Sequence, residues 1–149
     1  MLKKFLDPTF LEEYKSSPKY EKIRNQYKDF YEKVNIVPMP ITFSKMRMFS
    51  EYGERAQYEE AYNQHFDRLT ACAYMSIIYG DEKYIHELED CLYDVLSIYV
   101  WALSAHIPDI NEENYYELDL CSTAQGVTLA IIYKLLKDKL HPQLTKRIE

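Results

Sequence analysis

Glycine is scarce in this chain, with 3 copies in 149 residues. Tight β-hairpins rely on glycine at positive φ, so the scarcity argues against a sheet joined by such turns. Long apolar runs are missing too, because no stretch approaches the roughly 18 consecutive apolar residues that span a membrane. Residues 1–10 also lack the apolar run of about seven or more residues found in a secretion signal. We therefore expect no membrane partner and a cytoplasmic protein, or a periplasmic or secreted one if a leader has been removed.

An excess of positive charge is missing as well. The net charge is −6 at pH 7, and lysine and arginine are spread along the sequence rather than clustered. This balance is a poor electrostatic match for nucleic acid, which we do not expect as a partner. A polyanionic sugar would suit the chain only if the fold gathered a local basic patch.

Cysteine and the common catalytic motifs give no support for disulfide, metal or cofactor chemistry. Cys72, Cys91 and Cys121 are odd in number and far apart, and each falls in an apolar helical pattern, so we interpret them as reduced core residues. There is no Gly-rich phosphate loop, Gly-x-Ser-x-Gly, His-Glu-x-x-His or Cys-x-x-Cys. A calcium loop starting at residue 109 fails, because Asn114 replaces the turn glycine and Leu120 the bidentate glutamate. We expect no metal and no cofactor.

Tyrosine is the residue in excess, with 15 copies. Its ring is large and flat with a polar tip, which suits a core, an interface or stacking on sugar rings. We interpret most of these tyrosines as core residues and half-buried helix flanks.

The strongest helical pattern covers residues 81–103. Apolar residues at three- and four-residue steps predict one amphipathic α-helix, about 35 Å long at ~1.5 Å per residue. These positions are Tyr84, Leu88, Cys91, Leu92, Val95, Ile98, Tyr99 and Ala102. Trp101 and His106 come at its end, and Asp119 opens the next helix after a polar loop. We place a candidate site at this rim.

The other segments predict an all-α fold of antiparallel helical hairpins in one domain, residues 1–149. Asp7-Pro8 and Ser17-Pro18 each start a helix in the N-terminal part, residues 1–36. Residues 37–53 form a connector, extended at its prolines and with a short helix over 44–52. Hairpins fill residues 54–149, beginning with a long helix over 54–79 that ends at a left-handed Gly80. The helix after Asp119 is apolar almost all round, so we expect it to be covered on several sides.

Five stretches in order resemble the N-terminal helical region of heparinase II/III-like polysaccharide lyases. They are Tyr52-Gly53-x-Arg55-x-x-Tyr58-Glu59, Tyr79-Gly80-Asp81-x-x-Tyr84-Ile85-x-x-Leu88-Glu89-Asp90, Trp101-Ala102-Leu103-Ser104-Ala105-His106, Leu118-Asp119-Leu120-x-x-x-Ala124 and Leu135-Leu136-x-Asp138-x-Leu140. The likeness covers the chain from about residue 38 onward. Ser104 departs from the pattern, since members have proline at that position.

The resemblance implies part of an (α/α) toroid with a cleft across the ring. Such enzymes break a glycosidic bond to a uronic acid by β-elimination, which neutralises the carboxylate, removes the C5 proton and protonates the leaving oxygen. The family's asparagine, histidine and tyrosine for these steps match no position within residues 1–149. General acid–base chemistry needs groups within hydrogen-bond reach of the reacting atoms, so we expect no activity from this chain alone and catalytic residues beyond residue 149.

Four residues are candidates for binding the acidic polysaccharide or oligosaccharide. Trp101 would stack on a sugar ring or plug the core at a helix end. His106 would bind a substrate hydroxyl or carboxylate, or a nearby carbonyl. Asp119 is an N-cap and also a partner for His106 across the loop. Arg55 would face a carboxylate or be an exposed residue at a helix start, whereas His65 and His86 are interpreted as lying on polar helix flanks.

A rival hypothesis is a free-standing helical module that binds a protein or dimerises. The short last helix suggests instead a fragment of a larger array, and an incomplete toroid exposes an apolar face. Such faces rarely stay uncovered in soluble monomers, so we expect a homo-oligomer through the exposed helical face.

Overall fold

The structure, a computed structural model, describes residues 1–107 and 117–149. Every regular element in this described part is a helix, which confirms the all-α prediction. The order is η1 (Leu2–Leu6), α1 (Pro8–Ser16), η2 (Pro18–Tyr20), α2 (Glu21–Val34), α3 (Phe43–Tyr52), α4 (Ala56–Ile78), α5 (Glu82–Val95), η3 (Ser104–His106), α6 (Leu120–Leu136) and α7 (Pro142–Ile148). Within the described ranges, no helix is long and apolar enough to cross a membrane.

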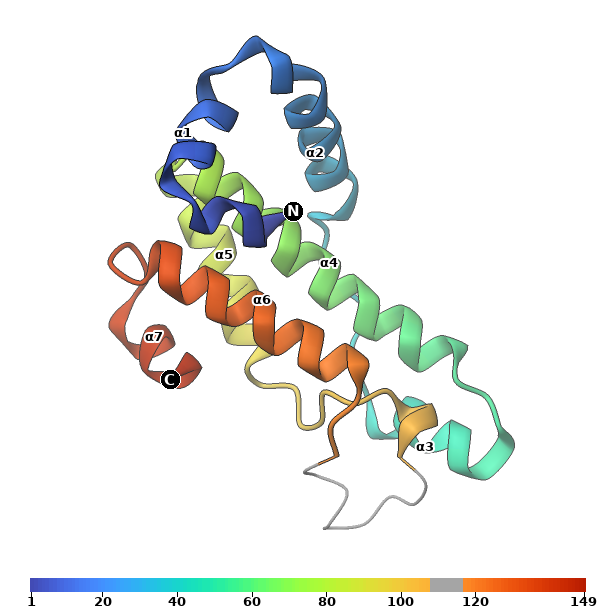
Figure 1. Cartoon of the computed structure of the whole chain (residues 1–149). Helices are drawn as coiled ribbons and strands as arrows, with labels where there is room; N and C mark the ends of the chain where they lie inside the picture. The colour runs from blue at the N-terminus through green and yellow to red at the C-terminus, as the bar shows by residue number, and fades with distance from the viewer. Residues whose placement is uncertain (108–116) are drawn as a thin grey trace.

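Helix α4 is the centre of the fold (Figure 1). It has 23 residues, and nearly all of its C-terminal half is buried. Helix α5 runs antiparallel beside it, α2 packs on another side, and α6 also contacts it. The joint between α4 and α5 is made by Gly80 at φ 72, the left-handed conformation predicted for it.

Helix α5 is shorter than the predicted helix over 81–103, which is a correction to the sequence analysis. It ends at Val95, so Ile98, Tyr99 and Ala102 lie outside it. The apolar spacing continues past Val95, but the backbone finds other partners there. Tyr62 Oη donates to the carbonyl of Trp101 at 2.9 Å, and Trp101 Nε1 donates to the carbonyl of Val95 at 3.3 Å. Tertiary hydrogen bonds therefore replace the helical ones.

The N-terminal elements form an aromatic cluster against the C-terminal half of α4. The ring of Tyr27 stacks on that of Tyr74, with centroids 4.3 Å apart. The hydroxyls of Tyr14 and Tyr74 are 2.8 Å apart, and Phe5 packs on both rings. The prediction that tyrosines build the core is correct for this cluster.

Helix α6 is covered on fewer sides than its composition suggested. Its buried face contacts η1 and α4, and Leu129, Ile132 and Leu136 lie on that face. The opposite face is open, with Leu120 88% exposed and Val127 50% exposed. The expectation of cover on several sides therefore holds for the faces that contact η1, α4 and α7 but not for the open face, where threonine, alanine and glycine lie between the large residues.

The connector predicted before α4 is extended where the prolines lie. Residues 37–42 have no helical structure, and Thr42 then caps α3 by accepting a hydrogen bond from the backbone of Lys45. Helix α3 ends at Tyr52, as the predicted short helix did, and Gly53 caps it in the left-handed conformation. The segment 108–116, where the calcium-loop pattern begins, lies outside the described residues.

Candidate functional site

Asp119 joins three parts of the chain at the start of α6. One carboxylate oxygen accepts a hydrogen bond from the backbone of Ser122 at 2.7 Å, and the backbone N–H of Asp119 donates to Ser122 Oγ at 2.8 Å. This reciprocal pair is a capping box and confirms the predicted N-cap. The other carboxylate oxygen accepts from the backbone of Leu103 at 2.9 Å and lies 2.7 Å from His106 Nδ1. The link across the loop that the sequence suggested is therefore present.

The pKa of the Asp119 carboxyl reflects two opposing effects. Burial would raise it, but the hydrogen bonds from Ser122, Leu103 and His106 stabilise the carboxylate more strongly and lower the pKa to about 2. Asp119 is therefore ionised at neutral pH. A carboxylate can only accept hydrogen bonds, so His106 Nδ1 carries the proton of this contact. The His106 side chain is 46% exposed. Its Nδ1 is used by Asp119, and Nε2 is the other polar atom of the ring.

Two tyrosines of α4 hold the segment that follows α5. Tyr58 Oη donates to the carbonyl of Val100 at 3.4 Å, one residue before the bond from Tyr62 to Trp101. Burial, and then the nearby charge of Asp119, raise the pKa of Tyr58 to about 12. Both phenols stay protonated and act as donors at neutral pH, because burial also raises the pKa of Tyr62. The segment from Val100 to Leu103 is thus held by two tyrosines of α4 and by Asp119, the N-cap of α6.

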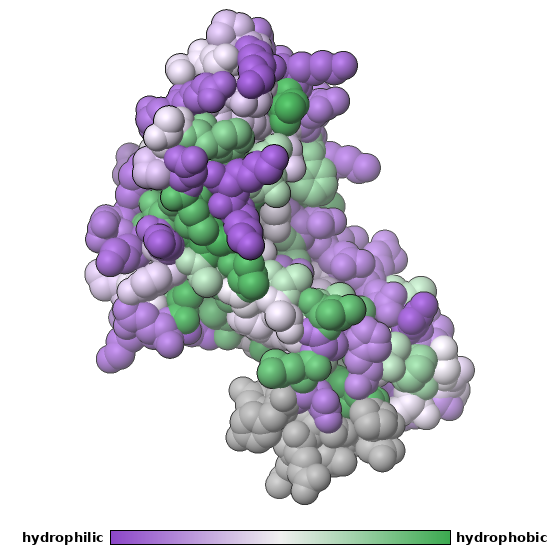
Figure 2. All heavy atoms as spheres, viewed as in Figure 1, coloured by the Kyte–Doolittle hydropathy of each residue, from purple (hydrophilic) through white to green (hydrophobic). Residues whose placement is uncertain are grey.

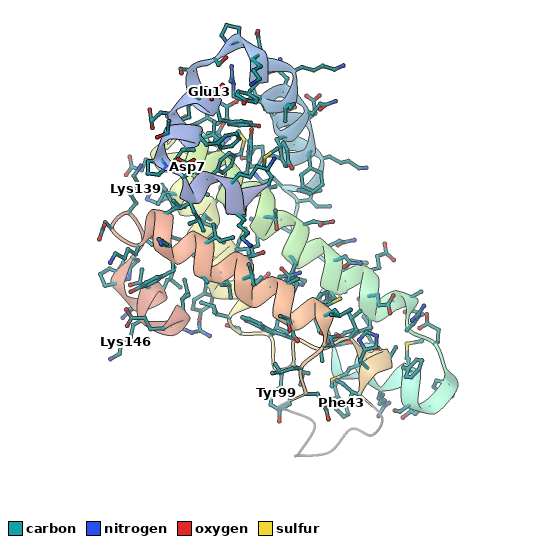
Figure 3. All side chains as sticks on the ribbon, in the orientation of Figure 1. Asp7, Glu13, Phe43, Tyr99, Lys139 and Lys146 are labelled. Atoms are coloured by element: carbon teal, nitrogen blue, oxygen red, sulfur yellow. The ribbon has the colours of Figure 1, made fainter. Side chains whose placement is uncertain are left out.

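A groove of about 760 Å³ lies between this segment, the start of α6 and α7. Its lining combines apolar, aromatic, hydroxyl and charged residues, namely Leu96, Ile98, Tyr99, Trp101, Glu117, Leu118, Ser122, Thr123, Gly126 and Arg147. Tyr99 projects outward from the segment after α5 and is 71% exposed (Figure 3). The volume falls in the range of about 300–1,000 Å³ typical of small-molecule sites.

Arg147 brings a guanidinium to this groove from α7. Its Nη2 donates to the carbonyl of Leu96 at 2.5 Å, and its guanidinium carbon lies 5.8 Å from the centre of the Tyr93 ring. These two contacts fix the side chain against α5 while the residue stays exposed. The sequence analysis missed Arg147, because only the packing of α7 on α5 brings it near Trp101.

The structure places the four predicted binding residues in different environments. Trp101 lines the groove, and its ring also meets Phe66 edge-to-face at 6.0 Å, so it both plugs the core and forms a wall. Asp119 lies between lining residues Leu118 and Ser122, while His106 is outside the described lining. Arg55 forms an ion pair with Glu59 at 3.5 Å and is also outside the lining.

His65 was wrongly placed on a polar flank. It is 7% exposed, and its two ring nitrogens contact Asp94 Oδ2 at 2.5 Å and the carbonyl of Met39 at 3.0 Å. Gln64 Oε1 accepts from the backbone N–H of Met39 at 2.9 Å. His65 therefore attaches the connector to α4 and α5. Periodicity could not reveal this, because the covering residue comes from a segment with no helical pattern. His86 is exposed, as predicted, and pairs with Glu82 at 3.8 Å.

No family model matches the chain, and a search of curated proteins finds no match. The function must therefore be argued from the groove and its residues.

Proposed function

We propose that this chain forms one wall of a polysaccharide-binding cleft, the opening helices of an (α/α) toroid in a heparinase II/III-like lyase that cleaves uronic-acid-containing glycans. The observation that carries the proposal is the groove in which two aromatic side chains, Tyr99 and Trp101, share a lining with the guanidinium of Arg147. The five sequence stretches described above also support the proposal, and one of them contains Trp101.

The chemistry of this lining suits an acidic sugar. Aromatic side chains offer flat apolar faces with a polar tip, which match the faces and hydroxyl edges of a pyranose ring. A guanidinium binds a carboxylate through two parallel hydrogen bonds. Ser122 and Thr123 also line the groove, with their hydroxyls bonded to the backbone of Asp119. The chain is acidic overall, and the lining holds one positive side chain, Arg147, beside one negative side chain, Glu117.

The same lining supports binding rather than turnover by this chain alone. β-Elimination needs a base for the C5 proton and an acid for the leaving oxygen, both within hydrogen-bond reach. The charged residues among the described lining residues are Glu117 and Arg147. We propose that the acid–base groups come from other parts of a larger protein, and that this chain contributes the binding wall.

Isothermal titration calorimetry with uronate-containing oligosaccharides and their carboxyl-reduced counterparts tests the proposal. We expect Arg147→Gln to weaken binding of the acidic sugars about tenfold, the equivalent of ~1.4 kcal/mol, and to leave the reduced sugars nearly unaffected. Tyr99→Ala should weaken both sugar types. Arg47→Gln is the matched control, because Arg47 is an exposed arginine of α3 paired with Glu51.

The proposal fails if no uronate-containing oligosaccharide binds. It also fails if Arg147→Gln and Tyr99→Ala bind these sugars as the wild type does. A loss of affinity equal to that of Arg47→Gln would show a general effect of net charge. Arg147 would then have no specific role in binding the sugar.

A second candidate function is a helical interaction module, which a different observation favours. Leu120 and Val127 are exposed on one face of α6, together with Leu118 before the helix. Hydrophobic surface follows α6 across the view in Figure 2. A contiguous apolar surface of this kind is typical of a face that another helix covers.

A further inference from the structure

His65 lies between two hydrogen-bond acceptors that come from different parts of the chain. Its Nδ1 is 2.5 Å from Asp94 Oδ2 in α5, and its Nε2 is 3.0 Å from the backbone carbonyl oxygen of Met39. A carboxylate and a carbonyl accept hydrogen bonds and cannot donate them. Both contacts are therefore hydrogen bonds only when each ring nitrogen carries a proton, which makes His65 a positively charged imidazolium. A neutral imidazole has one N–H and can satisfy only one of the two acceptors.

Charged groups from three helices surround this histidine. Asp94 of α5 forms the ion pair with His65, and its side chain is 41% exposed to water. Arg68 lies three residues along α4, where its guanidinium donates to an asparagine side chain after α2 at 3.2 Å. Lys45 of α3 donates to a carbonyl of the connector at 3.0 Å. A hydrogen bond with a second thiol, and burial, raise the pKa of Cys91 in α5, so this thiol stays neutral.

From this arrangement we infer that His65 is a pH-dependent latch, which holds the extended part of the connector, residues 37–42, against α4 while the ring is protonated and releases it when the ring is neutral. The N–H that remains after deprotonation stays with Asp94, because a hydrogen bond to a carboxylate is about twice as strong as one to a neutral carbonyl. The lone pair of Nε2 then faces the carbonyl oxygen of Met39, and the two acceptors repel each other. Release therefore follows a rise in pH.

The extended part of the connector depends strongly on its contacts at Met39. Gln64 Oε1 accepts from the Met39 N–H at 2.9 Å, so both backbone polar groups of Met39 are bound by neighbouring side chains of α4. Residues 37–42 have no helical structure, and Val37 and Pro40 on either side of Met39 are exposed. Helix α3 follows this segment directly and packs on η3. Release at Met39 should therefore also loosen the cover that α3 gives to η3.

Nuclear magnetic resonance of the whole chain from about pH 5 to 9 tests the latch, because this range brackets the ordinary titration of histidine. The ring nitrogen resonances should show His65 as an imidazolium at the low end and as the Nδ1–H tautomer at the high end. The protection of the Met39 amide against hydrogen exchange, corrected for the intrinsic effect of pH on exchange, should fall about tenfold over the same transition.

Three variants separate the latch from a general effect of pH. Asp94→Asn keeps an acceptor at Nδ1 but removes the charge that favours the imidazolium, so the transition should move to lower pH. His65→Gln should lose the transition altogether. His86→Gln is the matched control and should behave as the wild type, because His86 is an exposed histidine paired with Glu82. Asp94 is partly exposed, so Asp94→Asn decides the question if the His65 variant does not fold.

A His65 ring that stays neutral throughout the titration overturns the inference, because the proton of the contact would then belong to Asp94. An Asp94→Asn variant with the midpoint of the wild type overturns it too. The same holds if protection of the Met39 amide does not follow the titration of the ring. A fall of equal size in His65→Gln would assign the effect to another titrating group.

Discussion

Asp119 combines the capping of a helix with the fixing of a loop. A helix N-cap needs one acceptor for the first turn, and Ser122 uses one carboxylate oxygen for this. The second oxygen holds Leu103 and His106. The carboxylate therefore ties the segment after α5 to the start of α6, and its ionisation should matter to the stability of both.

The depressed pKa of Asp119 predicts a loss of stability in acid. The carboxyl titrates at 3.8 when unperturbed and at about 2 in the fold. Its contribution of about 2 kcal/mol is complete above pH 4 and is lost as the pH falls through 2. Asp119→Asn lacks this titration, so the difference in unfolding free energy between wild type and variant should shrink over that range. Urea unfolding from pH 7 to 2 measures it, and a constant difference would contradict the prediction.

Ser104 predicts a stabilising substitution. It is the first residue of η3, it is buried, and its hydroxyl oxygen has no hydrogen-bond partner among the described residues. The preceding Leu103 has φ −67 and ψ 144, which is the region that proline requires of its predecessor. Ser104→Pro should therefore raise the free energy of unfolding by about 0.5–1 kcal/mol through a less flexible unfolded chain.

Thermal denaturation compares Ser104→Pro with Ser104→Ala, which removes the hydroxyl without restricting the backbone. Equal stability of the two variants would show that the backbone is not set for proline. The prediction also bears on the family resemblance, because members have proline where this chain has Ser104.

At the scale of elements, local signals located most of the helices. Asp7 caps α1 and Pro8 starts it, and Gly80 makes the left-handed turn after α4, as the sequence predicted. These signals depend on the residues themselves. The end of α5 could not be predicted, because the apolar spacing continues to Ala102 while phenols of α4 bind the carbonyls of the segment. The groove was equally hidden, since Arg147 reaches it only through the packing of α7.

The two glycines Gly80 and Gly126 predict opposite responses to alanine. Gly80 has φ 72, and an added Cβ would lie 3.4 Å from Lys139 Nζ, so Gly80→Ala should cost about 1–2 kcal/mol of stability. Gly126 lies within α6 with nothing within 4 Å of an added Cβ, so Gly126→Ala should stabilise by about 0.5–1 kcal/mol. Denaturant melts of both variants measure the signs. The same sign for both would contradict the backbone assignment.

At the scale of the whole molecule, the three free cysteines report on different degrees of opening. Cys72 and Cys91 are buried between α4 and α5, whereas Cys121 is partly exposed at the start of α6. A hydrogen bond with Cys72 and burial raise the pKa of the Cys91 thiol, and burial raises that of Cys121. The thiolate is the reactive form, so accessibility separates the sites.

Alkylation of the native protein should therefore modify Cys121 first, and Cys72 and Cys91 only at the rate of global unfolding. Mass spectrometry of peptides after timed exposure to iodoacetamide measures the order. Addition of urea below the unfolding transition should accelerate the two buried sites together. Independent modification of Cys72 and Cys91 would show that α4 and α5 separate locally.

The hydroxyls of Tyr58 and Tyr62 have a consequence for how residues 96–103 behave outside the intact protein. These residues have a helical apolar pattern, yet their carbonyls are bound by phenols located about forty positions earlier in the chain. A synthetic peptide of residues 82–103 has no such donors, so its helix should extend beyond Val95 in a helix-promoting solvent. A peptide that stays non-helical beyond Val95 would show that the tyrosines of α4 do not hold this segment out of the helix.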